Sequence, residues 1–326
     1  MKSRILEALR ESGGYVSGQE LSERFGVSRT AVWKNIRQLQ EEGYVIEAVT
    51  NKGYRIVSSP DILTSEEVSS RIDTKMAGCE VVCLESVDST NQVVKKMAEE
   101  GAREGTLVIA DRQTAGKGRS GRVWETPRGS AVAMTLLLRP PLPPERISMV
   151  TLVMGMAVAE AVRETTGLDA GLKWPNDVVI GSKKVCGILT EMSAEMTCVN
   201  YIVIGVGINV NMTSFPEEIS GIATSLALES KKEWPRAPLI ACVMKHFEAF
   251  YEAFLESGDL APLKERYNRL LVNAGREVKV MDPQGSYTGT ASGIDDLGRL
   301  IVTDSEGRIK EVYAGEVSVR GLYGYV

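Results

Sequence analysis

The stretch QTAGKGRSGRVW, residues 113–124, constrains the fold more than any other part of the sequence. It places three glycines among three cations and contains no acidic residue: Gly116, Gly118 and Gly121 alternate with Lys117, Arg119 and Arg122. Glycines let backbone N–H groups approach a ligand closely, and interleaved cations favour an anion such as a phosphate. A flexible linker would need neither the cations nor the closing Trp124. We therefore interpret this glycine-rich loop as an anion-binding element.

The segments that flank the loop exclude two common nucleotide-binding folds. The glycines fit G-x-G-x-x-G behind a strand-like run, Thr106–Ala110, but a dinucleotide-binding fold then requires a helix and an acidic residue about 20 positions on. A second apolar run, Ala131–Leu138, follows instead, and Arg139 stands at the far position. No Gly-Lys pair precedes Ser or Thr, so the P-loop pattern is absent as well. The loop therefore belongs to a different scaffold.

The composition is that of an ordinary globular protein. With 326 residues, of which 43% are hydrophobic and 25% charged, the chain can form two or three domains with separate cores. The most apolar run, Met149–Ala159, is too short to span a bilayer, and no basic and apolar leader opens the sequence. The five cysteines lack C-x-x-C spacing, and Cys79 and Cys83 have no nearby histidine, because His246 is the single one. We expect a reduced, cytoplasmic protein without membrane contact or a structural zinc site.

Residues 1–59 differ from the rest of the chain in charge and pattern. They carry nine Lys and Arg against seven Asp and Glu, a net charge of +2, whereas the remainder carries −7. Ser17–Glu20 reads as a capping box for a short helix over Gly18–Phe25. Ser28 can cap a second helix to about Gln40, whose apolar residues recur at helical spacing.

A hairpin over Tyr44–Val57 follows these helices and completes the pattern of a winged helix-turn-helix. Such folds also serve as protein-contact modules, but the polar face of the second helix lacks acidic residues, which favours DNA. The residues predicted to contact DNA are Ser28, Arg29, Thr30, Lys34, Asn35 and Arg37, with Trp33 partly in the core.

Polar residues in the middle of the chain stand where strands end or helices begin. Asp88–Gln92 starts a helix, so Ser89 or Thr90 is a natural cap, yet a run of polar residues can also bind a polar ligand group. Leu172–Ile180 and Val185–Glu191 read as a hairpin with polar positions on apolar strands: Lys173, Asn176, Asp177 and Lys184. A core strand, Tyr201–Asn209, contains two glycines that leave room for a ligand.

The last part of the chain reads as two helices, Pro238–Ser257 and Leu260–Val272, followed by short strands separated by turns at Asp282–Gly285 and Ser305–Gly307. The expected strands are Glu277–Met281, Ser286–Ala291, Arg299–Thr303 and Glu311–Val317. These strands predict a small SH3-like barrel. The fold class is therefore α+β: a winged helix-turn-helix over residues 1–60, a central α/β domain with a mixed sheet over 61–272, and the barrel over 273–326.

Five motifs in this order resemble the biotin–protein ligases: Ser89-Thr-Asn-Gln, Gly116-Lys-Gly-Arg-Ser-Gly, Lys173-Trp-Pro-Asn-Asp, Lys184-Val-Cys-Gly-Ile-Leu and Gly205-Val-Gly-Ile-Asn. With its winged helix, the chain is similar to the bifunctional bacterial form, which is both ligase and repressor of the biotin operon. Lys117 departs from the family's usual arginine and loses its bidentate fork. The loop from Met212 to Thr224 has no tryptophan to cover an adenine.

The resemblance implies two half-reactions. The biotin carboxylate attacks the α-phosphate of ATP, and a lysine of biotin carboxyl carrier protein then takes the biotin from biotinyl-5′-AMP. Cations and Mg²⁺ offset the repulsion between the two anions. The implied catalytic residues are Lys184, Arg119 and Lys117. The implied biotin-binding residues are Ser89, Thr90, Asn91, Gln113, Lys117, Gly118, Arg119, Lys184 and Gly187. The implied ATP-binding residues are Arg119, Arg122, Trp124, Asn176, Asp177, Lys184 and Asn209.

The resemblance also implies regulation: the adenylate-bound form dimerises, and two winged helices then span a palindromic operator. We expect the glycine-rich loop to become ordered over the adenylate and to exclude water. Two alternatives stay open, a lipoate-type ligase and a ligand-sensing repressor without ligase activity. The arginine- and glycine-rich motif of the first is missing, and intact Lys184 and Arg119 speak against the second.

Overall fold

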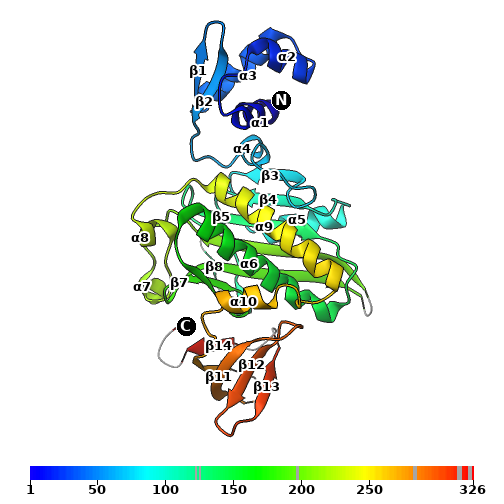
Figure 1. Cartoon of the computed structure of the whole chain (residues 1–326), viewed down its shortest axis with the longest axis vertical. Coiled ribbons are helices and arrows are strands. Elements are labelled where there is room, and N and C mark those ends of the chain that lie inside the picture. Colours follow the sequence, from blue (N-terminus) through cyan, green and yellow to red (C-terminus); the bar gives the residue numbers. More distant parts are fainter. Residues whose placement is uncertain (122, 125, 196–197, 282–284, 314–317, 322–324) are drawn as a thin grey trace.

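The computed structural model describes residues 1–121, 123–124, 126–195, 198–281, 285–313, 318–321 and 325–326. Figure 1 shows an N-terminal helical domain, a large central α/β domain and a small C-terminal β-domain arranged along the long axis of the molecule. The N-terminal domain consists of α1 (Lys2–Ser12), α2 (Gly18–Phe25), α3 (Arg29–Glu41) and the hairpin of β1 (Val45–Val49) and β2 (Gly53–Ser58).

The predicted helix-turn-helix and wing are confirmed. Ser17 Oγ accepts a hydrogen bond from Glu20 N at 3.0 Å, and Ser28 Oγ accepts one from Ala31 N at 3.2 Å. α1 was not expected from the sequence, although Leu6 lies in the core of this domain. The buried residues of α1, Ile5, Leu6, Ala8 and Leu9, recur at helical spacing, so the signal for α1 is present in the sequence.

A seven-stranded mixed sheet forms the centre, in the order β3-β4-β5-β9-β8-β7-β6. Strands β3 and β4 pair in parallel, and the other neighbours pair antiparallel. The strands are β3 (Glu80–Leu84), β4 (Thr106–Ala110), β5 (Ala131–Leu138), β6 (Ala170–Lys173), β7 (Asp177–Ile180), β8 (Lys183–Ala194) and β9 (Val199–Asn209). The glycine-rich loop thus lies between two antiparallel strands, as its flanks indicate.

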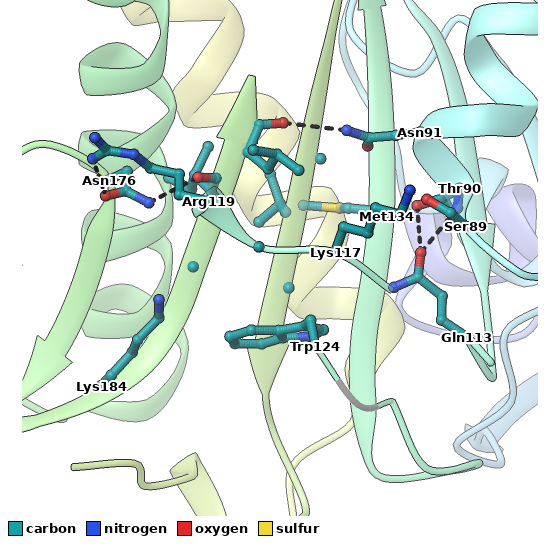
Figure 2. Close-up of a pocket in the computed structure, with 17 residues that line it drawn as sticks. Ser89, Thr90, Asn91, Gln113, Lys117, Arg119, Trp124, Met134, Asn176 and Lys184 are labelled. Atoms are coloured by element: carbon teal, nitrogen blue, oxygen red, sulfur yellow. Dashed lines mark hydrogen bonds between the residues drawn. The ribbon is translucent and has the colours of Figure 1, made fainter. Parts of the chain in front are cut away.

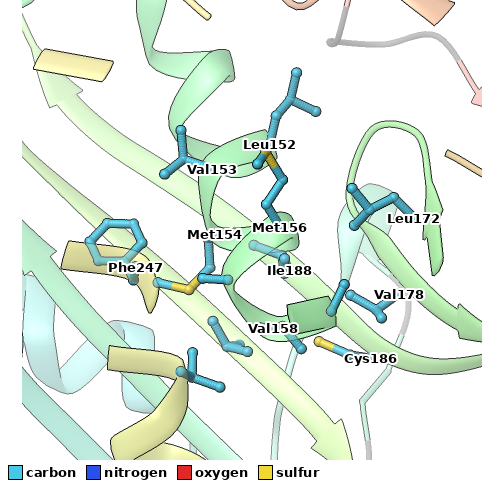
Figure 3. Close-up of a cluster of buried hydrophobic side chains, with 14 of the residues drawn as sticks. Leu152, Val153, Met154, Met156, Val158, Leu172, Val178, Cys186, Ile188 and Phe247 are labelled. Carbon is cyan, nitrogen blue, oxygen red and sulfur yellow. The ribbon is translucent and has the colours of Figure 1, made fainter. Parts of the chain in front are cut away.

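The two faces of this sheet carry different helices. α6 (Ile147–Thr166) and α9 (Arg236–Ser257) pack on one face, and α5 (Thr90–Glu99) packs on the other. Figure 3 shows the core under α6, where Met154 and Met156 lie near Ile188 of β8. Side chains alternate along β9: Ile204 belongs to that core, whereas Val203 packs in the cluster with α5. By the same alternation the two glycines of β9 face α5.

The segment Leu172–Ile180 is not a single strand, which corrects the prediction. It forms β6 and β7, which turn at the cis peptide bond between Trp174 and Pro175 and place Lys173 opposite Asp177. Apolar patterning does not reveal this turn, because Trp174 is itself buried and its Nε1 donates to Gly298 O at 3.0 Å. The predicted hairpin around Gly181 is present between β7 and β8.

The C-terminal domain is a five-stranded antiparallel sheet in the order β13-β12-β11-β10-β14. It follows α10 (Lys264–Leu270) and consists of β10 (Glu277–Met281), β11 (Tyr287–Ile294), β12 (Leu300–Asp304), β13 (Ile309–Val312) and β14 (Ser318–Gly321). The predicted strand Glu311–Val317 begins within β13, and its residues 314–317 lie outside the described residues, as do 282–284 of a predicted turn. Three short α-helices and two 3₁₀ helices complete the described part of the chain: α4 (Ser65–Ser69), α7 (Glu217–Ser220), α8 (Leu226–Ser230), η1 (Arg119–Gly121) and η2 (Pro144–Arg146).

A buried carboxylate joins the N-terminal and central domains. Glu67 of α4 is 1% exposed, and its oxygens accept hydrogen bonds from Arg10 Nη2, Tyr44 OH and Arg71 Nε, each at 2.7 Å. Arg10 lies in α1 and Tyr44 precedes β1, so two donors come from the N-terminal domain. Burial, together with the bond to Glu67, raises the pKa of the Tyr44 hydroxyl.

A buried arginine holds the linker between the same two domains. Arg236, at the start of α9, is 2% exposed, and its Nε donates to Asp61 Oδ2 at 2.9 Å. Its Nη1 donates to Asp111 Oδ1 at 2.6 Å, just after β4. One guanidinium therefore links the interdomain segment to the residue that precedes the glycine-rich loop.

Candidate active site

The predicted ligand-binding residues come together in one pocket on the α5 face of the sheet (Figure 2). Eleven of them line it: Ser89, Thr90, Asn91, Gln113, Lys117, Gly118, Arg119, Trp124, Asn176, Lys184 and Gly187. The wall also contains Gly205 and Gly207, the two glycines expected to leave room for a ligand. Four further residues of the wall are not predicted from the sequence: Met134, Ile188, Leu189 and Val206. The two glycines of β9 are the signal that could have found these apolar neighbours, since they mark an open strand face.

The glycine-rich loop folds back on itself to form one wall of the pocket. Lys117 and Val123 form a β-bridge, and Trp124 N donates to Gly116 O at 2.9 Å. A side chain at Gly116 would approach Trp124 O to 2.4 Å, so this close turn requires glycine. The turn directs the Trp124 indole into the pocket, where a Cβ on Gly207 would lie 2.4 Å from Trp124 Cε2.

The N terminus of α5 supplies a connected set of polar groups. Ser89 is the N-cap residue, but its side chain makes no capping hydrogen bond. Thr90 Oγ1 donates to Gln113 Oε1 at 3.0 Å and lies 2.7 Å from Thr135 Oγ1. The capping interpretation of these hydroxyls therefore fails for the side chains of both residues, and their arrangement suits a small polar ligand group.

Asn91 belongs to the same set and is fixed from two sides. Its Oδ1 accepts from Thr135 Oγ1 at 2.7 Å, and its Nδ2 donates to Glu191 Oε2 at 2.7 Å. Burial favours the protonated form of Glu191, but the hydrogen bonds from Lys95 and Asn91 and the charges of Lys95 and Lys117 outweigh it and lower the pKa. An ionised Glu191 thus holds the Asn91 amide in one orientation.

The opposite end of the pocket is cationic. Arg119 Nη1 donates to Asn176 Oδ1 at 3.1 Å, and Lys184 Nζ lies 5.5 Å from the centre of the Trp124 ring. Lys184 Nζ also lies 2.6 Å from Asp177 Oδ1, which is an ion-pair distance although the approach lacks hydrogen-bond geometry. This end can therefore stabilise negative charge on a ligand that enters between Arg119 and Lys184.

Two predicted site residues within the described chain are not part of the pocket wall. Asp177 does not line the pocket but forms an ion pair with Lys184, which does. Asn209 is 4% exposed and donates from Nδ2 to Thr224 O at 3.0 Å, so its amide is committed to the loop after β9. Arg122 lies outside the described residues.

A cluster of side chains that could ligate a metal lies on the other face of the sheet, on α6 and α9. Within the described chain it brings together Glu164, Cys242 and His246, which the sequence analysis does not anticipate. His246 Nε2 lies 2.7 Å from Glu164 Oε2, and Lys245 Nζ lies 3.6 Å from its other oxygen. The carboxylate therefore already pairs with neighbouring side chains and is separate from the pocket.

The predicted DNA-contacting residues lie on the exposed side of α3. Ser28, Arg29, Thr30, Lys34 and Arg37 are exposed, and Asn35 is half-buried with its Nδ2 donating to Ala31 O. Trp33 is 49% exposed and lies under the Arg37 guanidinium, so it is not a core residue, contrary to the sequence interpretation. A groove between α3 and the β1–β2 hairpin is lined by Arg29, Thr30 and Trp33.

The chain is similar over nearly its whole length to two characterised bacterial proteins. It is 38% identical to the bifunctional ligase/repressor BirA of Bacillus spizizenii over 98% of both chains. The chain belongs to the BirA family. It is also 32% identical to BirA of Escherichia coli, over 97% of this chain and 96% of the other.

Family models and a solved structure agree with this BirA-family assignment. Residues 83–209 match the biotin/lipoate A/B protein ligase family, 2–55 an HTH domain and 274–320 the biotin protein ligase C-terminal domain. The biotin protein ligase of Aquifex aeolicus, solved with biotin and ATP, is 34% identical, with a TM-score of 0.66 over 74% of this chain and 99% of that one. None of the described helices is long and apolar enough to cross a membrane.

Proposed function

We propose that this chain is a biotin–protein ligase that forms biotinyl-5′-AMP from biotin and ATP and transfers biotin to a lysine of biotin carboxyl carrier protein. The observation that carries the proposal is the division of one pocket. Its one end holds neutral polar groups at the start of α5, with Lys117 beside them, and its other end holds Arg119 and Lys184. Biotin has a neutral ureido ring and a carboxylate, which match these two ends.

The residues of the pocket can perform the first half-reaction without a nucleophile of their own. Thr90, Asn91 and Gln113 hold the ureido ring, and Ser89 lies beside them with a hydroxyl that does not cap α5. The carboxylate then lies near Lys184, whose ammonium offsets its repulsion with the α-phosphate. The oxygen of the carboxylate forms a bond to phosphorus as pyrophosphate leaves. Catalysis rests on positioning and charge.

The remaining predicted residues surround the nucleotide in this proposal. Arg119, steadied by Asn176, and Lys117 contact the phosphate, and Arg122 stays a prediction beyond the described residues. Asn209 acts indirectly, through the loop that its amide holds. Asp177 holds Lys184 through their ion pair of 2.6 Å, and Mg²⁺ brought with ATP would neutralise further phosphate charge.

Pyrophosphate release from biotin and ATP tests the proposal. Lys184→Ala should lower the rate about 100-fold or more, because one preorganised cation is lost at the reacting groups. Lys183→Ala is the matched control, since Lys183 is its exposed neighbour on β8 and should leave the rate unchanged. Equal rates for both variants, or release with lipoate in place of biotin, would contradict the assignment.

We propose in addition that the N-terminal domain binds operator DNA and that the adenylate-bound chain forms the dimer that represses. The exposed cations of α3 support DNA binding. We place the functional boundaries at residues 1–60, 61–272 and 273–326. Ligand-dependent dimerisation, measured by analytical ultracentrifugation with and without biotin and ATP, tests the second part of this proposal.

A further inference from the structure

A residue from the C-terminal region enters the catalytic end of the central domain. The Tyr325 hydroxyl donates a hydrogen bond to Asp177 Oδ2, across 148 positions of sequence. Asp177 Oδ1 is the oxygen that lies 2.6 Å from Lys184 Nζ. The two oxygens of one carboxylate are therefore divided between the tyrosine and the lysine.

The ring of Tyr325 makes a second contact in the same place. Lys173 Nζ lies 3.5 Å from the ring centre, and Lys173 is 5% exposed. Lys173 and Asp177 are opposite each other at the turn between β6 and β7. Tyr325 thus touches both residues of this cross-strand pair, one with its π face and one with its hydroxyl.

This geometry restrains a carboxylate that could otherwise rotate. With Oδ2 held by Tyr325, Oδ1 stays directed at Lys184, and the side chain of Asp177 is only 12% exposed. A lysine side chain has several rotatable bonds, so an anchored partner reduces the positions that its ammonium can take. Asp177, anchored by Tyr325, therefore restrains Lys184, the residue to which we assign stabilisation of the negative charge on the reacting groups.

We propose that Tyr325 is a positioning residue for adenylate formation, acting on Lys184 through Asp177. The inference rests on the proposed ligase function. It assigns the C-terminal region a part in the chemistry of the first half-reaction, since the hydroxyl orients the acid that orients the lysine. Packing alone would need the ring and not the hydroxyl.

Tyr325→Phe separates these two contributions, because phenylalanine keeps a ring for Lys173 and loses the donor to Asp177. In single-turnover reactions at saturating ATP, the rate of biotinyl-5′-AMP formation should fall about tenfold. The Kd for biotin should stay within about twofold, because the polar groups at the start of α5 lie at the other end of the pocket. Tyr313→Phe, at an exposed tyrosine of the C-terminal domain, is the matched control and should leave the rate unchanged.

A double-mutant cycle with Asp177→Asn tests the proposed route. In that background Tyr325→Phe should change the rate less than about twofold. The reactions are followed to completion so that a slow background rate is still measured. A wild-type rate for Tyr325→Phe, or the same tenfold loss in both backgrounds, would overturn the inference. Absence of adenylate formation by the wild-type protein would instead refute the ligase proposal itself.

Discussion

Gly207 shows how a single residue shapes the pocket. Its missing side chain provides the space in which the Trp124 indole lies, and the three atoms nearest to a Cβ at this position would all belong to that ring. The indole Nε1 is buried without a hydrogen-bond partner among the described residues. Space for the ring, and not a polar contact, therefore holds Trp124 across the pocket.

We expect Gly207→Ala to displace this ring and weaken biotin binding about tenfold, because overpacking a rigid contact costs about 1–3 kcal/mol. Isothermal titration calorimetry measures the affinity. Gly221→Ala is the control, since Gly221 has negative φ (−74°) and open space around its Cβ position. Equal biotin affinities for the two variants would mean that the position of Trp124 does not matter for binding.

Glu191 provides a pH-dependent prediction at the same scale. The pKa of Glu191 is lower in the folded state than its ordinary value of 4.5. The ionised side chain therefore stabilises the fold fully above pH 4.5, and this stabilisation is lost as the pH falls through the lowered pKa. Glu191→Gln should lower the free energy of unfolding by about 1 kcal/mol at pH 7. The difference should shrink toward zero below that pH window, because protonated glutamate resembles glutamine.

Urea unfolding of wild type and Glu191→Gln across pH 7 to about 3.5 checks this. Glu195→Gln, at an exposed position just beyond β8, should show no pH-dependent difference. A constant difference at all pH values would show that Glu191 acts through packing and not through its charge.

At the scale of elements, α3 carries the prediction for DNA. Arg29→Ala should weaken binding to a selected site by about 1–3 kcal/mol and affect an unrelated duplex less, because base-edge contacts are specific. The site is found by selection from a random-sequence library, and fluorescence anisotropy measures affinity. Arg24→Ala on α2 is the control, since Arg24 is exposed and pairs with Glu11. Equal losses of DNA affinity for Arg29→Ala and Arg24→Ala would contradict the assignment of α3 as the helix that contacts bases.

Local signals in the sequence predict the elements that depend on local chemistry. Ser17 and Ser28 cap their helices as expected, and β4 and β5 have the predicted bounds, because capping and apolar runs act within a few residues. The polar residues of the pocket are also predicted, since the motifs that carry them match a known family. The resemblance, and not periodicity, places Lys184 and Arg119 in one site.

Contacts between distant segments explain what the sequence does not reveal. The turn at Pro175 divides a run that reads as one strand, and Trp174 there is anchored by Gly298. Likewise, the hydroxyl of Thr90 has the ordinary appearance of a cap until Gln113 and Thr135 surround it. Such partners lie tens of residues away, so no local pattern contains them.

At the scale of the whole molecule, Arg236 fixes the linker that leaves the N-terminal domain onto the central domain. Arg236→Met should lower the free energy of unfolding by about 3 kcal/mol, because it leaves Asp61 and Asp111 without their buried partner. Arg128→Met should cost less than about 1 kcal/mol, because Arg128 contacts Asp111 from an exposed position. Chemical denaturation measures the free energy of unfolding of both variants. Equal losses would show that the buried Arg236 contributes no more stability than the exposed Arg128.

The contacts of the Arg236 guanidinium determine how far the chain can be shortened from its N terminus to give a fragment with the ligase domain alone. A fragment that starts at Asp61 retains the carboxylate that Arg236 Nε binds, whereas one that starts a residue later buries a cation with half of its partners removed. In either fragment Glu67 keeps Arg71 and loses Arg10 and Tyr44. A shortened enzyme intended for labelling other proteins should therefore begin no later than Asp61.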